Sequence, residues 1–178
     1  MNLANKITVS RILLIPVFVI SFELLEPGHL LPLILFIVAS LTDFLDGYIA
    51  RSKNQITTFG VFLDPLVDKM LTQAAFILLA GAGIIPAWTV IVIVCRELLI
   101  TGFRIVAASE NVNIAASKFG KYKTTTQFLS IIVFLAPTGV PHRDLIGFIL
   151  LYVCVFLTVW SGADYLWKNR EVLNLDDI

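Results

Sequence analysis

The sequence has little charge and few of the residues that stabilise soluble or disulfide-linked domains. Only 15% of its 178 residues are charged, whereas 58% are hydrophobic and the mean hydropathy is +0.90. This composition excludes an ordinary soluble globular domain and indicates a polytopic membrane protein. At roughly 20 residues per span plus short loops, the chain has room for six transmembrane helices. No repeat, low-complexity tract or soluble linker interrupts residues 1–178, so we expect one all-α membrane domain.

The chain also has only two cysteines and no formal net charge. The two cysteines, Cys95 and Cys154, lie in apolar runs without a CxxC motif or a Cys/His cluster. Buried reduced thiols are therefore expected, and neither cysteine receives a function. The formal net charge is zero. The charge balance gives no indication of a nucleic-acid partner, and we expect none.

Hydrophobic runs and turn residues predict six membrane-spanning helices. The first run follows two basic residues but lacks a small-residue cleavage site, so we expect a retained helix rather than a signal peptide. Of the 13 lysines and arginines, all except Arg143 fall on one side of the expected spans. This bias places both termini and residues 43–68 on the cytoplasmic side of the cell membrane. The expected helices cover about 9–25, 30–51, 59–80, 86–109, 124–137 and 145–167.

Four aspartates mark the ends of two neighbouring hydrophobic segments. Asp43 and Asp46 are three residues apart, and Asp64 and Asp68 are four apart, so each pair shares one face of a helix. Carboxylates brought this close cannot all ionise unless cations balance them, and Mg²⁺ or a related ion prefers such oxygen ligands. Two other interpretations stay open: solvated acids at amphipathic helix ends, and the carboxylate relay of a cation-coupled transporter.

The complete pattern is Asp43-x2-Asp46-Gly47-x2-Ala50-Arg51-x8-Gly60-x3-Asp64-x3-Asp68. It resembles the signature of the CDP-alcohol phosphotransferases, integral membrane enzymes of phospholipid synthesis. The resemblance implies that the four aspartates hold two divalent cations, Mg²⁺ or Mn²⁺, and that Asp68 acts as general base. It also implies a homodimer. The residues expected to contact the cytidine nucleotide are Thr8, Asp46, Gly47, Ala50, Arg51 and Gly60.

Three further runs resemble the phosphatidylglycerophosphate synthases of this family: Asn5-Lys6-x-Thr8-x2-Arg11, Arg96-Glu97-Leu98 to Arg104, and Gly120-Lys121-x-Lys123-Thr124-x2-Gln127. This resemblance implies that CDP-diacylglycerol and sn-glycerol 3-phosphate react to give phosphatidylglycerophosphate and CMP. The residues expected at the acceptor phosphate are Arg11, Arg96, Arg104, Lys118, Lys121, Lys123 and Thr124.

Other interpretations of these runs remain. The three lysines beside Gly120 are also typical of a patch that binds anionic membrane lipids, and Asn5, Thr8 and Arg11 suit an interfacial anchor. Arg96 and Glu97 could pair with neighbouring helices. Within the family, a cardiolipin synthase or an inositol-phosphate transferase would share the motif. A transporter would need polar positions through the bilayer midplane, whereas segments such as 71–80 and 146–157 are largely apolar.

Overall fold

The computed structural model describes residues 3–26, 28–52, 58–109 and 118–169, with side chains over 12–26, 28–42, 69–105, 107 and 119–169. Within these ranges the chain forms six α-helices and no strand, so the expected all-helical fold is confirmed. The helices are α1 (Leu3–Leu24), α2 (Leu30–Ser52), α3 (Thr58–Gly81), α4 (Ala87–Ser109), α5 (Lys118–Leu135) and α6 (Arg143–Lys168).

The fifth helix begins earlier than its apolar run predicts, at Lys118 rather than near residue 124. Its first turns are polar, and their threonine hydroxyls donate hydrogen bonds to carbonyl oxygens of the preceding turn. The Thr124 hydroxyl donates to the Gly120 carbonyl at 3.0 Å, and the Thr125 hydroxyl donates to the Lys121 carbonyl at 3.1 Å. Side chains that bond the preceding turn in this way do not interrupt a helix.

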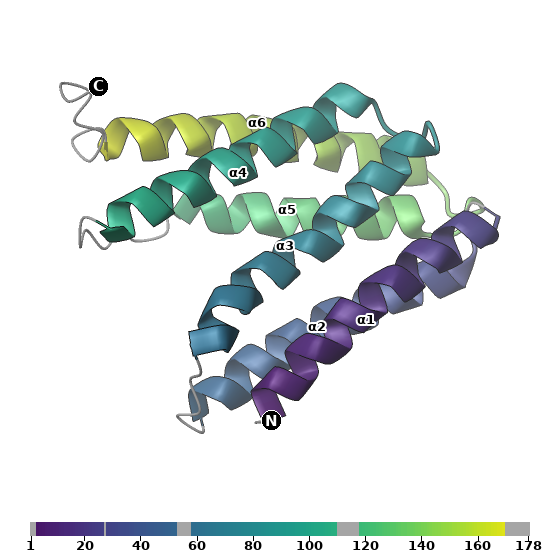
Figure 1. Ribbon diagram of the computed structural model, residues 1–178. Coiled ribbons are helices and arrows are strands. Elements are labelled where there is room, and N and C mark those ends of the chain that lie inside the picture. The colour runs from purple at the N-terminus through teal and green to yellow at the C-terminus, as the bar shows by residue number, and fades with distance from the viewer. Residues whose placement is uncertain (1–2, 27, 53–57, 110–117, 170–178) are drawn as a thin grey trace.

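The helices form three antiparallel pairs whose short connections lie together at one end of the molecule (Figure 1). α1 packs beside α2, α5 packs beside α6, and α4 packs on α6. α3 contacts α1, α2, α4 and α5, so it joins the pair α1 and α2 to the group formed by α4, α5 and α6. This alternation brings the end of α2, the start of α3, the end of α4 and the start of α5 to the opposite end. That end carries most of the charged residues.

Two close approaches hold the hairpins together at their connections. Gly28 has φ +87°, and a Cβ there would lie 2.9 Å from the Thr138 backbone nitrogen in the α5–α6 connection. Only glycine adopts this conformation freely and permits this contact. Between α5 and α6, a Cβ on Gly147 would lie 2.7 Å from Phe134 Cε1. Small residues at helix interfaces allow this kind of approach in membrane proteins.

The molecule buries polar side chains and exposes apolar ones. Lys123, Gln127, Thr158 and Ser161 are buried. The exposed faces of α1, α4 and α6 carry large apolar residues instead, including Leu13, Leu98, Leu99, Ile105, Phe156 and Trp160. Apolar surface on this scale is typical of a protein surrounded by lipid. α6 has 26 residues and contains an 18-residue window with a mean hydropathy of 2.2, so it is long and apolar enough to cross a bilayer.

Candidate active site

The aspartate motif is divided between two helices that pack on each other. Asp43 and Asp46 lie in the second half of α2, and Asp64 and Asp68 lie in the first half of α3. Gly47, Ala50 and Arg51 follow on α2, and Gly60 lies in the first turn of α3; the side chains of all these residues are outside the described set. Each aspartate pair therefore shares a helix face by its spacing.

The described side chains contain no group of three or more His, Cys, Asp or Glu that could hold a metal ion. The assignment of metal ligands thus stays with the four aspartates of the motif, as a prediction from the sequence. Thr8 and Arg11 are on α1 and Lys118 is the first residue of α5, but their side chains also lie outside the described set.

A cavity of about 680 Å³ lies among α3, α4, α5 and α6. Among the described side chains, its lining includes Lys69 of α3, the residue directly after Asp68, so the cavity lies close to the motif in the sequence of α3. The cavity is large enough for a small phosphorylated molecule. Its lining residues are Lys69, Thr72, Arg96, Glu97, Ile100, Arg104, Gly120, Lys121, Thr124, Thr125, Gln127, Phe128 and Tyr165.

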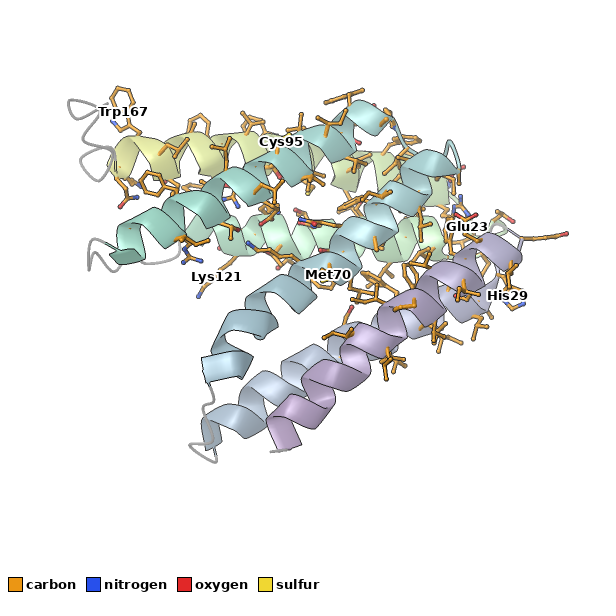
Figure 2. All side chains as sticks on the ribbon, viewed as in Figure 1. Glu23, His29, Met70, Cys95, Lys121 and Trp167 are labelled. Carbon is orange, nitrogen blue, oxygen red and sulfur yellow. The ribbon has the colours of Figure 1, made fainter. Side chains whose placement is uncertain are left out.

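The lining is strongly cationic. Among the described side chains it contains four cationic residues, Lys69, Arg96, Arg104 and Lys121, and one carboxylate, Glu97. Arg104 and Lys121 are exposed, and neither makes an ion pair with a carboxylate among the described side chains. Figure 2 shows the Lys121 side chain leaving α5 towards the side on which α3 lies. These two cations are therefore available to an anionic ligand.

Arg96 is held deeper in the wall. Its Nη2 donates to Ser161 Oγ at 3.0 Å, and its Nη1 lies 4.0 Å from Glu97 Oε1. Gly162 makes room for this side chain, because a Cβ there would lie 3.2 Å from Arg96 Cγ. The alternative that Arg96 pairs with a group on a neighbouring helix is thus observed as a hydrogen bond to α6, while its role at the acceptor phosphate stays a prediction.

Two polar atoms of the wall have no hydrogen-bond partner among the described residues. They are Arg96 Nε and the Tyr165 hydroxyl, and both are buried. Buried polar groups in folded proteins nearly always have a partner, and an exception calls for an explanation. Because both side chains line the cavity, a bound ligand with oxygen acceptors is one such partner.

Glu97 forms ion pairs with two lysines from neighbouring helices. Its carboxylate pairs with Lys123 Nζ of α5 and lies 3.3 Å from Lys69 Nζ of α3. The Lys69 ammonium also donates to Thr101 Oγ1 at 2.6 Å. Lys123 is only 1% exposed and does not line the cavity.

The structure brings together four of the residues predicted to bind the acceptor phosphate, Arg96, Arg104, Lys121 and Thr124. Thr124 is placed in the wall with its proton donated to Gly120, so in this conformation it offers the cavity lone pairs rather than a donor. Lys123 lies behind the wall on Glu97. None of these placements tests a role in binding.

Sequence reasoning did not select Lys69, Thr72, Phe128 and Tyr165, which also line the cavity. Lys69 directly follows Asp68 and is about 100° from it around the helix axis, so the spacing of the motif gave no indication that Lys69 lines a cavity. Tyr165 lies near the end of α6, directly after Asp164, and its position relative to α4 follows only from the packing of α4 on α6. Gln127 belongs to a run that the sequence did single out.

Comparison with known proteins identifies the family to which this fold and motif belong. The model of the CDP-alcohol phosphatidyltransferase family matches residues 1–160, and the chain belongs to this family. The resemblance carried by the aspartate motif is therefore confirmed.

Several curated relatives share one name, CDP-diacylglycerol–glycerol-3-phosphate 3-phosphatidyltransferase. The chain is 44% identical to the protein of this name from Bacillus subtilis (strain 168), over 97% of each chain. It is 38% identical to that of Haemophilus influenzae (strain ATCC 51907 / DSM 11121 / KW20 / Rd), over 99% of this chain and 97% of the relative. The Rickettsia bellii (strain RML369-C) protein is also 38% identical, over 92% of this chain and 93% of its own.

Proposed function

We propose that this protein transfers the phosphatidyl group of CDP-diacylglycerol to sn-glycerol 3-phosphate, giving phosphatidylglycerophosphate and CMP. The observation that carries the proposal is the cationic cavity, whose described lining includes Lys69, the residue directly after the last aspartate of the motif. A transferase acting on an uncharged alcohol would not need it. The names of the relatives, which the chain matches over nearly its whole length, support the same reaction.

The acceptor binds in the cavity through its phosphate. Arg104 and Lys121 are exposed cations without a carboxylate partner among the described side chains, so they can pair with a phosphate dianion at little cost. Arg96 Nε supplies a further donor from the buried part of the wall. Anchoring the phosphate here leaves the glycerol hydroxyls to extend along α3 towards Asp68.

The reaction takes place at the motif. A hydroxyl oxygen of the acceptor attacks the phosphorus of the phosphatidyl group, the bond between the two phosphates of CDP-diacylglycerol breaks, and CMP leaves. Asp68 takes the proton of the attacking hydroxyl, as general base. Gly47 and Ala50, which have almost no side chain, let the nucleotide lie against α2, and Arg51 pairs with a phosphate. Thr8, Asp46 and Gly60 complete the nucleotide site.

The donor set of the motif fits two divalent cations. It consists only of carboxylate oxygens, Asp43 and Asp46 on α2 and Asp64 and Asp68 on α3, and these helices are in contact. Mg²⁺ and Mn²⁺ take hard oxygen ligands of this kind together with substrate phosphates. When bound, the cations would neutralise the charge of the diphosphate.

The protein is further proposed to span the cell membrane with all six helices and to act as a homodimer. The exposed apolar faces of α1, α4 and α6 support contact with lipid over the length of the bundle. The distribution of lysine and arginine supports a cytoplasmic site and cytoplasmic termini. CDP-diacylglycerol then reaches the motif from the membrane, and the polar acceptor reaches it from the cytoplasm.

The test is CMP release by the protein purified in detergent, with CDP-diacylglycerol and Mg²⁺ or Mn²⁺. Glycerol 3-phosphate, inositol phosphate, serine and phosphatidylglycerol are supplied separately. We expect release that requires both the metal ion and glycerol 3-phosphate. Activity with another acceptor alone would assign a different member of the family. No release with any acceptor, from folded protein, would contradict the transferase function.

A pair of matched variants tests the metal ligands. Asp64→Asn removes one carboxylate of the motif and is expected to abolish CMP release. Asp164→Asn removes an acid on α6 that pairs with Lys168 at 2.8 Å, outside the cavity lining, and is expected to leave release near the wild-type rate. Near-normal release by a folded Asp64→Asn protein would refute the metal-site assignment.

A further inference from the structure

Glu97 is a carboxylate inside the helix bundle that meets cations from three helices. Its side chain is 12% exposed and lies on α4. It contacts Lys69 of α3, Lys123 of α5 and Arg96 of its own helix. Buried ion pairs of this kind contribute little net stability compared with apolar packing. The arrangement therefore has to be explained by what it holds in place.

The two lysines have different surroundings. Lys123 is 1% exposed and absent from the cavity wall, so it serves as the buried counter-ion of Glu97. Lys69 has a side chain that is 33% exposed and lines the cavity. Because Lys123 stays with Glu97, the carboxylate remains ionised and fixed in position. It can then act as a fixed anchor for Lys69.

Lys69 is held at two points. Its Nζ lies 3.3 Å from Glu97 Oε2 and donates to Thr101 Oγ1 at 2.6 Å. The Thr101 hydroxyl donates its own proton to the Glu97 carbonyl oxygen at 2.7 Å, so a lone pair faces the ammonium. Both anchors belong to one turn of α4. Together they fix the direction of the Lys69 side chain and tie α3 to α4.

This tie lies beside the reaction site in the sequence. Lys69 directly follows Asp68, and Asp64 lies one helical turn before Asp68. On a continuous helix, fixing one side chain against a neighbouring helix fixes the rotation of the adjacent residues about the helix axis. Positions of reacting groups matter to within about 1 Å, because a displacement of that size can lower a rate by about a hundredfold.

We propose that Glu97 is a positioning residue that holds Lys69, and through it the face of α3 that carries Asp64 and Asp68. Lys69 takes part as a tether and not as a ligand of the acceptor phosphate, because its ammonium is already held by the Glu97 carboxylate and the Thr101 hydroxyl. Arg104 and Lys121, which have no such carboxylate among the described side chains, are left to bind the acceptor. The inference rests on the proposed function.

The test compares Thr101→Val and Glu97→Gln with the wild type and with Lys121→Ala. Binding of Mn²⁺ alone is measured from the electron paramagnetic resonance signal of the free ion, and kcat and the acceptor KM are measured separately. For Thr101→Val and Glu97→Gln we expect weaker Mn²⁺ binding and a kcat lowered about tenfold or more, with the acceptor KM within about twofold. For Lys121→Ala we expect the reverse: a raised acceptor KM with unchanged Mn²⁺ binding.

Folding is controlled within the same set. Glu97→Gln leaves the Lys123 ammonium buried without its carboxylate, so it is paired with the double variant Glu97→Gln/Lys123→Met, which removes both charges. Thr101→Val keeps the shape of the side chain and both ion pairs. Elution on size exclusion and the thermal midpoint identify the folded variants.

Unchanged Mn²⁺ binding and kcat in folded Thr101→Val and in the folded double variant would overturn the proposal. A raised acceptor KM with unchanged Mn²⁺ binding would overturn it too, and would make Lys69 a ligand of the acceptor. The proposed function fails separately: wild-type protein that binds Mn²⁺ but releases no CMP would refute the reaction, while the Mn²⁺ comparison among the variants would still test the tether.

Discussion

Tyr165 combines a ring that is packed against the protein with a hydroxyl that is left for a ligand. Its ring packs edge-on against Phe103 with the centroids 5.8 Å apart, and the residue is 5% exposed. Its hydroxyl has no hydrogen-bond partner among the described residues. The ring is therefore fixed by packing, and the hydroxyl is left as a polar group of the cavity.

Tyr165→Phe is predicted to weaken acceptor binding without destabilising the protein. The ring contact with Phe103 is kept, and removal of an unpartnered hydroxyl is neutral or stabilising in the free protein. A lost hydrogen bond of about 1 kcal/mol corresponds to a rise of about fivefold in the acceptor KM. Thermal unfolding in detergent and initial rates at varied glycerol 3-phosphate give the two quantities.

Tyr152→Phe is the control, because Tyr152 stacks between Trp88 and Phe148 and does not line the cavity. We expect it to change neither quantity. A lowered thermal midpoint of Tyr165→Phe with an unchanged acceptor KM would show that the hydroxyl serves the fold instead.

The candidate site could be predicted from sequence where charge or spacing marks it. Arg96, Arg104 and Lys121 are charged residues in or beside apolar runs, which is costly unless they serve a purpose. Tyr165 carries no such mark, and the charge of Lys69 does not show which way its side chain points. Whether they reach the cavity depends on the rotation of α3 and α6 about their axes, which is set by packing between helices distant in sequence.

At the scale of the helices, the hydrophobic runs placed each element within a few residues. They failed at the start of α1, which begins at Leu3 rather than near residue 9, and at the start of α5, where residues 118–123 are too polar for a membrane span but fold as helix. The hydroxyls that bond the preceding turn and the burial of Lys123 against Glu97 explain the start of α5. The ion pair joins residues 26 apart in sequence, so no local pattern indicates it.

The contact between α5 and α6 gives a prediction at this scale. Gly147→Ala would place a methyl group 2.7 Å from Phe134 Cε1. Phe134 is 2% exposed and packs against Phe148 with the ring centroids 5.4 Å apart, so it has little freedom to move. Overpacking of this kind lowers the free energy of unfolding by about 1–3 kcal/mol. We expect a lower thermal midpoint in detergent.

Gly102→Ala is the matched control on α4, because a Cβ there would meet nothing within 4 Å. Alanine favours helix over glycine by about 1 kcal/mol. We therefore expect an unchanged or raised thermal midpoint. Equal effects of the two substitutions would contradict the close packing of α5 on α6.

At the scale of the whole molecule, the informative feature is where the charged residues lie along the bundle and not their net charge. The formal net charge is zero, yet among the lysines and arginines that the structure describes only Arg143 lies at the end where the short connections gather. Together with the apolar exterior, this distribution separates a lipid-facing body from one charged end. The motif and the cavity both lie towards that end, which suits chemistry between a membrane lipid and a water-soluble acceptor.

This separation predicts the orientation in the membrane, which cysteine labelling can measure. Gly139→Cys lies in the α5–α6 connection, where a Cβ meets nothing within 4 Å, and Lys168→Cys lies at the end of α6 with a side chain that is 65% exposed. The expectation that both cysteines are buried is wrong for Cys95, which is exposed, so both variants are made in a Cys95→Ala background. Cys154 is retained because it is fully buried. In right-side-out membrane vesicles, an impermeant maleimide should label Gly139→Cys at once and Lys168→Cys only after detergent is added. The opposite result would place the cationic cavity outside the cell, where cytoplasmic glycerol 3-phosphate could not reach it. Labelling of both from one side would mean that α6 does not cross the bilayer.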